Sequence, residues 1–190
     1  MSKGEQRDDV IGQLTPLRRY ARALTRDEAQ ADDLVHDALV RAYERRSTFR
    51  TGGNLRAWLL SVLHNTFVDG RRRRAADSRR DAEAAQLTDP AVPAGQESSI
   101  RLQQLRRAFM ALPEEQRAAL HLVTVEGLAY QQAADTLAIP IGTLMSRLGR
   151  ARAALRAFEA RSGSAELAAL PAPPAASRPN LRVVGGSHDD

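Results

Sequence analysis

The fold of the second half of the chain is decided by the stretch Glu126-Gly-Leu-Ala-Tyr-Gln-Gln-Ala-Ala-Asp-Thr-Leu-Ala-Ile-Pro-Ile-Gly-Thr-Leu-Met-Ser-Arg-Leu-Gly-Arg-Ala-Arg152. Apolar residues at helical spacing on both sides of Ala138–Pro140 predict two helices joined by a tight turn. The buried faces are predicted to carry Ala133, Ala134 and Leu137 in the first helix, and Leu144, Leu148, Ala151 and Leu155 in the second. The other face of the second helix is predicted to carry Thr143, Ser146, Arg147, Arg150 and Arg152. Hydroxyls and guanidiniums suit the edges of a major groove, so this stretch predicts a DNA-binding helix-turn-helix. The alternative is a plain helical hairpin with a solvated basic face.

Helical patterns also fill the sequence on both sides of this stretch. The second half is predicted to hold about four helices, at Ile100–Ala111, Pro113–Val125, Tyr130–Leu137 and Ile141–Ala160. The first half is predicted to hold a helix over Val10–Leu24 that is interrupted near Pro16, a second helix, and a third from about Leu55 into Arg71–Arg74. The stripe that predicts the second helix consists of Ala31, Leu34, Val35, Ala38, Leu39 and Ala42. No stretch alternates at period two for long, so the predicted fold class is all-α.

Charge divides the 190 residues into four pieces. Residues 1–75 carry a net charge of +5, residues 76–99 carry −3, residues 100–161 carry +4 and residues 162–190 carry −1. Prolines, glycine and small polar residues in 76–99 predict a flexible linker. Prolines in 162–190 predict a disordered tail. The sequence therefore predicts two small helical domains, 1–75 and 100–161.

Composition narrows the class of protein. There is no cysteine, which excludes disulfides, cysteine-ligated zinc and iron–sulfur clusters. Lys3 is the only lysine, and arginine forks match phosphate and guanine better than lysine does, so a nucleic-acid partner is favoured. No apolar run approaches the roughly 20 residues of a membrane span, and the N-terminus lacks the apolar core of a signal peptide. These features predict a soluble cytoplasmic protein without direct membrane insertion.

The remaining polar groupings do not predict catalysis. The run Arg71–Arg74 suits phosphate contact, although a solvated helix end or a localisation signal would look the same. The acidic group around His36 is interpreted as a helix N-terminus and a polar or protein-binding face, not as a metal site. This acidic group consists of Asp27, Glu28, Asp32, Asp33 and Asp37. His64 and His121 are interpreted as core or surface histidines. We expect no enzyme activity, no catalytic residue, no metal and no cofactor.

Taken in order, these pieces resemble the extracytoplasmic-function (ECF) class of bacterial RNA polymerase sigma factors. Residues 27–43 resemble the second-region helix that docks on core RNA polymerase. Residues 49–65, with the arginine run after them, resemble the segment that melts and reads the −10 element. Leu112-Pro-Glu-Glu-Gln-Arg117 and the helix-turn-helix resemble the fourth region, which reads the −35 element.

The resemblance implies a role for three groups of residues. Polymerase binding at the beta-prime clamp helices is implied for Asp32, Asp33, Leu34, Asp37 and Arg41. Contact with the −10 element is implied for Arg50, Asn54, Trp58, Asn65, Arg71, Arg72 and Arg73. Contact with the −35 element is implied for Thr143, Ser146, Arg147, Arg150 and Arg152. Asn65 matches the asparagine that such factors use at a flipped-out base, and an unstacked base must be held in a pocket. Trp58 serves either as part of the melting wedge or as part of the core.

The resemblance also implies binding partners, and at three positions this sequence differs from the usual residues of the family. An alternative sigma factor would bind core polymerase, including its beta flap, and promoter DNA. In a stress or envelope response an anti-sigma factor would hold it. Leu59 stands where primary sigma factors have a second tryptophan, Met145 where Lys or Arg is frequent, and Ala138 where the turn often has glycine. The alternatives are a helix-turn-helix regulator that acts without polymerase, and a sigma-like decoy that titrates an anti-sigma factor.

Overall fold

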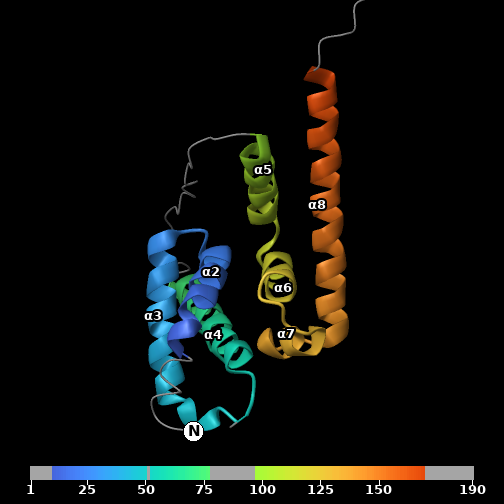
Figure 1. Cartoon of the computed structure of the whole chain (residues 1–190). Coiled ribbons are helices and arrows are strands. Elements are labelled where there is room, and N and C mark those ends of the chain that lie inside the picture. The colour runs from blue at the N-terminus through green and yellow to red at the C-terminus, as the bar shows by residue number, and fades with distance from the viewer. Residues whose placement is uncertain (1–9, 51, 78–96, 170–190) are drawn as a thin grey trace, which may run out of the picture.

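The computed structural model describes residues 10–50, 52–77 and 97–169, and these residues form helices without any strand (Figure 1). The first block comprises α2 (Leu14–Thr25), α3 (Glu28–Glu44), the short 3-10 helix η1 (Arg46–Thr48) and α4 (Leu55–Asp77). The second block comprises α5 (Glu97–Ala111), α6 (Glu114–Thr124), α7 (Tyr130–Thr136) and α8 (Ile141–Ala169). The predicted all-α class is confirmed.

Local sequence explains where the helices of the first block begin and end. Residues 10–12 are helical and Gln13 is a turn, so Pro16 falls in the first turn of α2, where a missing N–H costs no hydrogen bond. Arg26 ends α2 in the left-handed conformation with φ 62°. The side chain of Asp27 accepts a hydrogen bond from the Gln30 N–H at 2.8 Å and thereby caps α3.

The second block contains the predicted helix-turn-helix. Pro113 precedes α6, and α7 and α8 are joined by a turn in which Ala138 has φ 51°. In Figure 1, α8 runs antiparallel beside α5 and continues beyond it. The sequence predicted the end of this helix at Ala160 and a disordered tail from residue 162, whereas α8 continues to Ala169. Alanine, glutamate and leucine over residues 165–169 are strong helix formers, so the helix passes Gly163.

The two blocks pack against each other. Helix α2 contacts α6, and α4 contacts α7. One apolar cluster extends through both blocks, from Leu17 and Leu63 in the first to Leu122 and Leu144 in the second. Most of the predicted linker, residues 78–96, and the tail over 170–190 lie outside the described residues.

Candidate nucleic-acid interface

The helix-turn-helix is held by its turn and by an apolar seam. The Ile139 N–H donates to the Ala134 carbonyl at 3.1 Å, and the Thr143 N–H donates to the Pro140 carbonyl at 2.9 Å, which fixes the start of α8. The seam consists of Ala133, Ala134 and Leu137, packed with Leu144, Leu148 and Ala151. The predicted buried face of α8 is confirmed except for Leu155, which is only partly buried.

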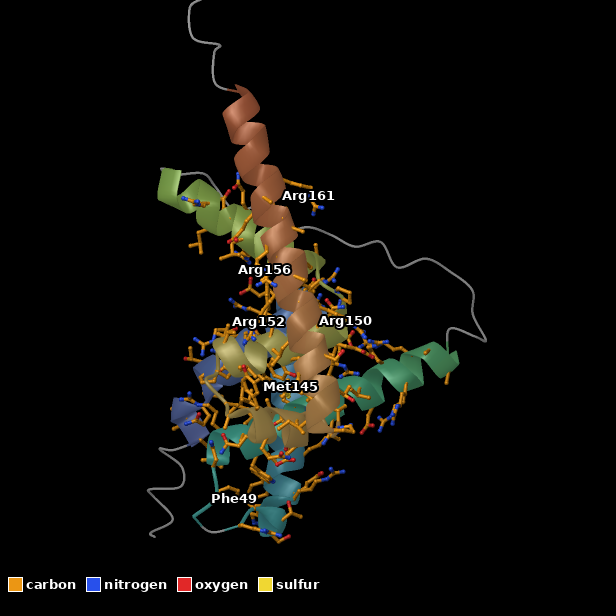
Figure 2. All side chains as sticks on the ribbon, turned by 90° about the vertical axis from the view of Figure 1, so that its right-hand side faces the viewer. Phe49, Met145, Arg150, Arg152, Arg156 and Arg161 are labelled. Carbon is orange, nitrogen blue, oxygen red and sulfur yellow. The ribbon has the colours of Figure 1, made fainter. Side chains whose placement is uncertain are left out.

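The five residues predicted to contact the −35 element do not share one face. Thr143, Ser146 and Arg150 are exposed on the first turns of α8. The Arg147 side chain is only 20% exposed and pairs with Glu115 at 2.8 Å. Arg152 donates to the Tyr130 hydroxyl at 3.3 Å, and Figure 2 shows it on the opposite side of α8 from Arg150. The contiguous polar face is therefore smaller than predicted.

The residues predicted for the −10 element lie along α4 and the segment before it. Asn65 and Arg50 are exposed, as are Arg72 and Arg73. Arg71 pairs with Glu114 of the second block. Asn65, Arg72 and Arg73 lie on one helix with Arg71, which has a partner within the chain, whereas Arg50 lies before this helix.

Asn54 and Trp58, both predicted to contact the −10 element, make contacts within the protein at the start of α4. The Asn54 side chain accepts from the Ala57 N–H at 3.1 Å, so it caps α4. Trp58 is half-buried, and its ring centroid lies 5.3 Å from that of Phe49, which directly follows η1 and is labelled in Figure 2. Leu59 is buried, so a wedge is not available at this position.

The acidic face of α3 is exposed as predicted, with one exception. Asp32, Asp33 and Asp37 are exposed. Arg41 forms an ion pair with Asp69 of α4, with 3.6 Å between Arg41 Nη1 and Asp69 Oδ2. Leu34 is only 8% exposed and belongs to the core, because it lies on the apolar stripe that faces the other helices. Leu34 is therefore corrected from a surface residue to a core residue.

A polar cluster that the sequence did not reveal lies between the two blocks, and its centre is buried. We call it the interblock cluster, and it consists of Arg19, Tyr20, His64, His121 and Glu126. The Glu126 carboxylate has no exposed surface, and it accepts two hydrogen bonds from Arg19, at 2.9 and 3.1 Å, and one from His121 Nε2 at 3.0 Å. Burial alone would raise the pKa of Glu126, but the hydrogen bonds from His121 and Arg19 outweigh it and lower the pKa.

Tyr20 connects the rest of the interblock cluster. Its ring lies with its centroid 5.3 Å from that of His121, and its hydroxyl is 3.0 Å from His64 Nδ1. Burial raises the pKa of Tyr20, so the hydroxyl stays protonated and donates a hydrogen bond to Nδ1 of a neutral His64. Burial, together with the charge of nearby Arg147, lowers the pKa of His64 to about 4.

Arg117 joins the blocks at a second point. It is only 2% exposed, and burial is the main cause that lowers its pKa to about 10, so the guanidinium stays charged at neutral pH. It donates to the Ala23 and Leu24 carbonyls of α2, and also to the Met110 and Leu112 carbonyls of its own block. Helix C-termini leave carbonyls without partners, and a cation there is favourable. No sequence spacing signals such a contact, because its partners are backbone atoms about 93 residues away.

Comparison with known proteins identifies the class. Residues 10–64 match the family described as "Sigma2 domain of PhyR", and residues 102–155 match "Sigma-70, region 4". The chain is 36% identical over 152 residues to the ECF RNA polymerase sigma factor EcfG of Rhodopseudomonas palustris, a match that covers 80% of this chain and 83% of that protein. It is 34% identical over 140 residues to the ECF sigma factor SigM of Mycobacterium tuberculosis, covering 73% and 69%.

Solved structures agree with the sequence comparison. The sigma factor RpoE of Bartonella quintana, solved in complex with the anti-sigma factor NepR, matches with a TM-score of 0.71 and 32% identity, covering 81% of this chain and 96% of that one. CnrH, solved in complex with the cytosolic domain of CnrY, matches with a TM-score of 0.58 and 25% identity, covering 81% and 86%. The helical fold and the helix-turn-helix are those of a sigma factor for transcription initiation. The chain belongs to the ECF family of RNA polymerase sigma factors.

Within the described residues, no helix is long and apolar enough to cross a membrane.

Proposed function

We propose that this sigma factor binds core RNA polymerase through the acidic face of α3 and reads two promoter elements, −10 through α4 and −35 through α8. The observation that carries the proposal is the exposed polar face at the start of α8, formed by Thr143, Ser146 and Arg150 on the second helix of a helix-turn-helix. In that motif the N-terminal residues of the second helix enter the major groove. Asn65 is exposed on α4, so its side chain is accessible to a splayed base.

The division of labour follows from the chemistry of each surface. Arg150 can form bidentate hydrogen bonds with guanine, and the hydroxyls of Thr143 and Ser146 can bond to several base edges. Arg72 and Arg73 are exposed, so their guanidiniums suit contact with phosphates near the melted segment. The sigma factor supplies recognition, and the polymerase carries out the chemistry in the cytoplasm.

The surface of α3 supports the polymerase contact. Asp33 and Asp37 are one helical turn apart and exposed. Substituting Asp37 with arginine is expected to weaken binding to core polymerase, because it reverses the charge at a proposed polar interface. Binding of fluorescent core polymerase, with Glu44→Arg as an exposed control further along α3, measures the effect.

An anti-sigma factor is the second proposed partner. RpoE of Bartonella quintana and CnrH were each solved with such a protein bound. The likeness of this chain to both supports a similar regulator here. Inhibition of transcription by a purified candidate from the same genome tests this part of the proposal.

Run-off transcription tests the promoter assignment. Core bacterial polymerase is assayed with and without this protein on a promoter library from its source genome. Selective transcripts are expected, and they are expected to fall at least roughly tenfold with Asn65→Ala or Arg150→Ala, because one base contact contributes about 1–3 kcal/mol of discrimination. Arg161→Ala is the matched control, since Arg161 is exposed on α8 three turns beyond Arg150. Failure to bind core polymerase would favour the plain regulator, and binding without transcripts would favour the decoy.

A further inference from the structure

Two apolar side chains are exposed at the start of α8, beside the polar residues proposed to read the −35 element. Ile141 is 43% exposed and Met145 is 56% exposed. They are four residues apart, so they are neighbours on the same side of the helix. The seam that holds α8 in place contains Leu144 and Leu148, which are buried. Met145 therefore stands outside this seam, and its apolar side chain is available to a partner.

The exposed surface of α8 beside Met145 carries only short side chains. A Cβ atom added to Gly142 or Gly149 would meet nothing within 4 Å, and Ser146 lies between these glycines on the exposed side of the helix. Figure 2 shows Met145 and Arg150 on different sides of α8. These two long side chains project beyond the short ones between them, so both can reach base edges when the start of α8 lies in a major groove.

The chemistry of an exposed methionine complements one feature of the major groove. Of the four bases, only thymine presents an apolar group there, its C5 methyl, and apolar side chains contact that group. A thioether has no donor and is a weak acceptor, so Met145 is poorly suited to the polar edges of the other bases. Its unbranched side chain has three rotatable bonds and a polarisable sulfur, so it can adapt to the position of a methyl group.

We propose that Met145, with Ile141 beside it, contacts the C5 methyl of a thymine in the −35 element and thereby selects an A·T pair at one position of the promoter. The proposal rests on the proposed function of α8. It adds a thymine contact on one side of the helix to the guanine contact proposed for Arg150 on the other. Met145 is then a specificity-determining residue whose contribution is apolar.

Replacing thymine with uracil tests the proposal, because it removes the C5 methyl and keeps every hydrogen-bonding group of the base pair. The assay uses holoenzyme, formed from core polymerase and the full chain, on a promoter selected by run-off transcription. Each thymine of the −35 element, on either strand, is replaced in turn, and affinity is measured by competition with the unmodified promoter. At one thymine, or at two neighbouring ones, affinity is expected to fall roughly fourfold, as for the loss of one buried methyl group.

Substitutions of Met145 identify the side chain that contacts the methyl. Met145 is exposed, so Met145→Ala leaves no cavity in the core, and this variant is expected to bind the thymine and uracil promoters equally well. Met145→Leu keeps an apolar side chain of similar volume and is expected to retain the preference for thymine. Arg150→Ala is the matched control on the same helix. It is expected to weaken binding of both promoters by the same factor and to leave the fourfold ratio intact.

The possible results separate this proposal from the proposed function. Equal affinity of the wild-type holoenzyme for thymine and uracil at every position of the −35 element would overturn the proposal, as would a −35 element without any A·T pair. A loss with uracil that persists in Met145→Ala would overturn it too, because another residue would then contact the methyl. Failure of the proposed function is seen earlier, as the absence of any selected promoter in the run-off assay, and the thymine contact then falls with it.

Discussion

The partly buried His64 side chain predicts a pH dependence of the stability of this sigma factor. Burial, with a smaller effect of Arg147, lowers its pKa from 6.5 to about 4. Because the pKa of a base is lowered on folding, the unfolded chain binds protons more readily between pH 6.5 and 4. The contribution of His64 to stability is therefore complete above pH 6.5 and is lost as the pH falls toward 4.

We expect the free energy of unfolding to fall by about 2 kcal/mol between pH 7 and pH 5 from His64 alone. Urea unfolding at each pH measures it. His64→Gln, which keeps an acceptor for the Tyr20 hydroxyl, is expected to flatten the profile. His36→Gln removes an exposed histidine and serves as the control. A profile for His64→Gln as steep as that of wild type would show that His64 is not responsible.

Ala138 is a second residue at which a local rule is broken. Its φ of 51° lies in the left-handed region, which costs an L-residue roughly 1–2 kcal/mol. Ala138→Gly removes this strain and is expected to stabilise the protein by about 0.5–1 kcal/mol, after allowing for the greater freedom of glycine in the unfolded chain. Thermal unfolding checks the sign. Ala154→Gly, at an exposed position inside α8, is expected to destabilise by a similar amount.

At the scale of the element, α4 depends on its cap. Asn54→Ala removes the hydrogen bond to the Ala57 N–H and is expected to cost about 1 kcal/mol of stability. Asn54→Asp keeps a capping oxygen but changes the charge beside the proposed −10 surface. If the Ala and Asp variants lose promoter opening equally while only Ala loses stability, Asn54 contacts DNA in addition to capping the helix.

The first turns of α8 present an apolar side chain where a cation would strengthen DNA binding. Met145 is 56% exposed and stands near the proposed groove-facing residues (Figure 2). Met145→Arg is expected to tighten binding of duplex DNA and to steepen the slope of log K against log salt by about 1, which corresponds to one more phosphate neutralised. Ala157→Arg places the same charge about 18 Å further along the helix and is expected to leave the slope unchanged. Fluorescence anisotropy over a salt series measures both.

Most elements could be predicted from sequence because each carries its own signal. The spacing from Ala31 to Ala42 gave α3, and the apolar pairs on both sides of Ala138 gave the helix-turn-helix. The same spacing explains why Leu34 was misplaced: family resemblance put it on a binding surface, while its position on the apolar stripe already indicated the core. The length of α8 was underestimated, because one glycine does not stop a helix that strong helix formers continue.

The arrangement of the whole molecule could not be predicted, because its contacts join residues far apart in sequence. Glu126 was quoted as the start of the helix-turn-helix stretch, yet nothing near it indicated that Arg19 would reach it 107 residues away. Arg117 was part of the segment that resembles the fourth region, but its partners in α2 are backbone carbonyls, which have no sequence signature. Charge patterning predicted two basic blocks, but it carried no information on their packing.

The shared packing also has a consequence for the unfolding of the whole molecule. Trp58 is the only tryptophan and lies in the first block, so its fluorescence reports on that block alone. Leu122 is fully buried in the second block, and Leu122→Ala is expected to destabilise that block by about 2–5 kcal/mol. Because the blocks contact each other through the interblock cluster and the shared apolar cluster, the Trp58 transition is expected to move to lower urea as well, by an amount limited to the interaction free energy between the blocks.

The Arg19→Glu background separates coupling from general destabilisation. With the ion pair to Glu126 replaced by repulsion, Leu122→Ala is expected to shift the Trp58 transition much less, while helix content measured by circular dichroism still shows early unfolding of the second block. In the Arg18→Glu background the shift is expected to be as large as in wild type, because the Arg18–Asp32 pair lies within the first block. An equal shift in all three backgrounds would mean that the apolar cluster, and not the polar contacts, couples the blocks.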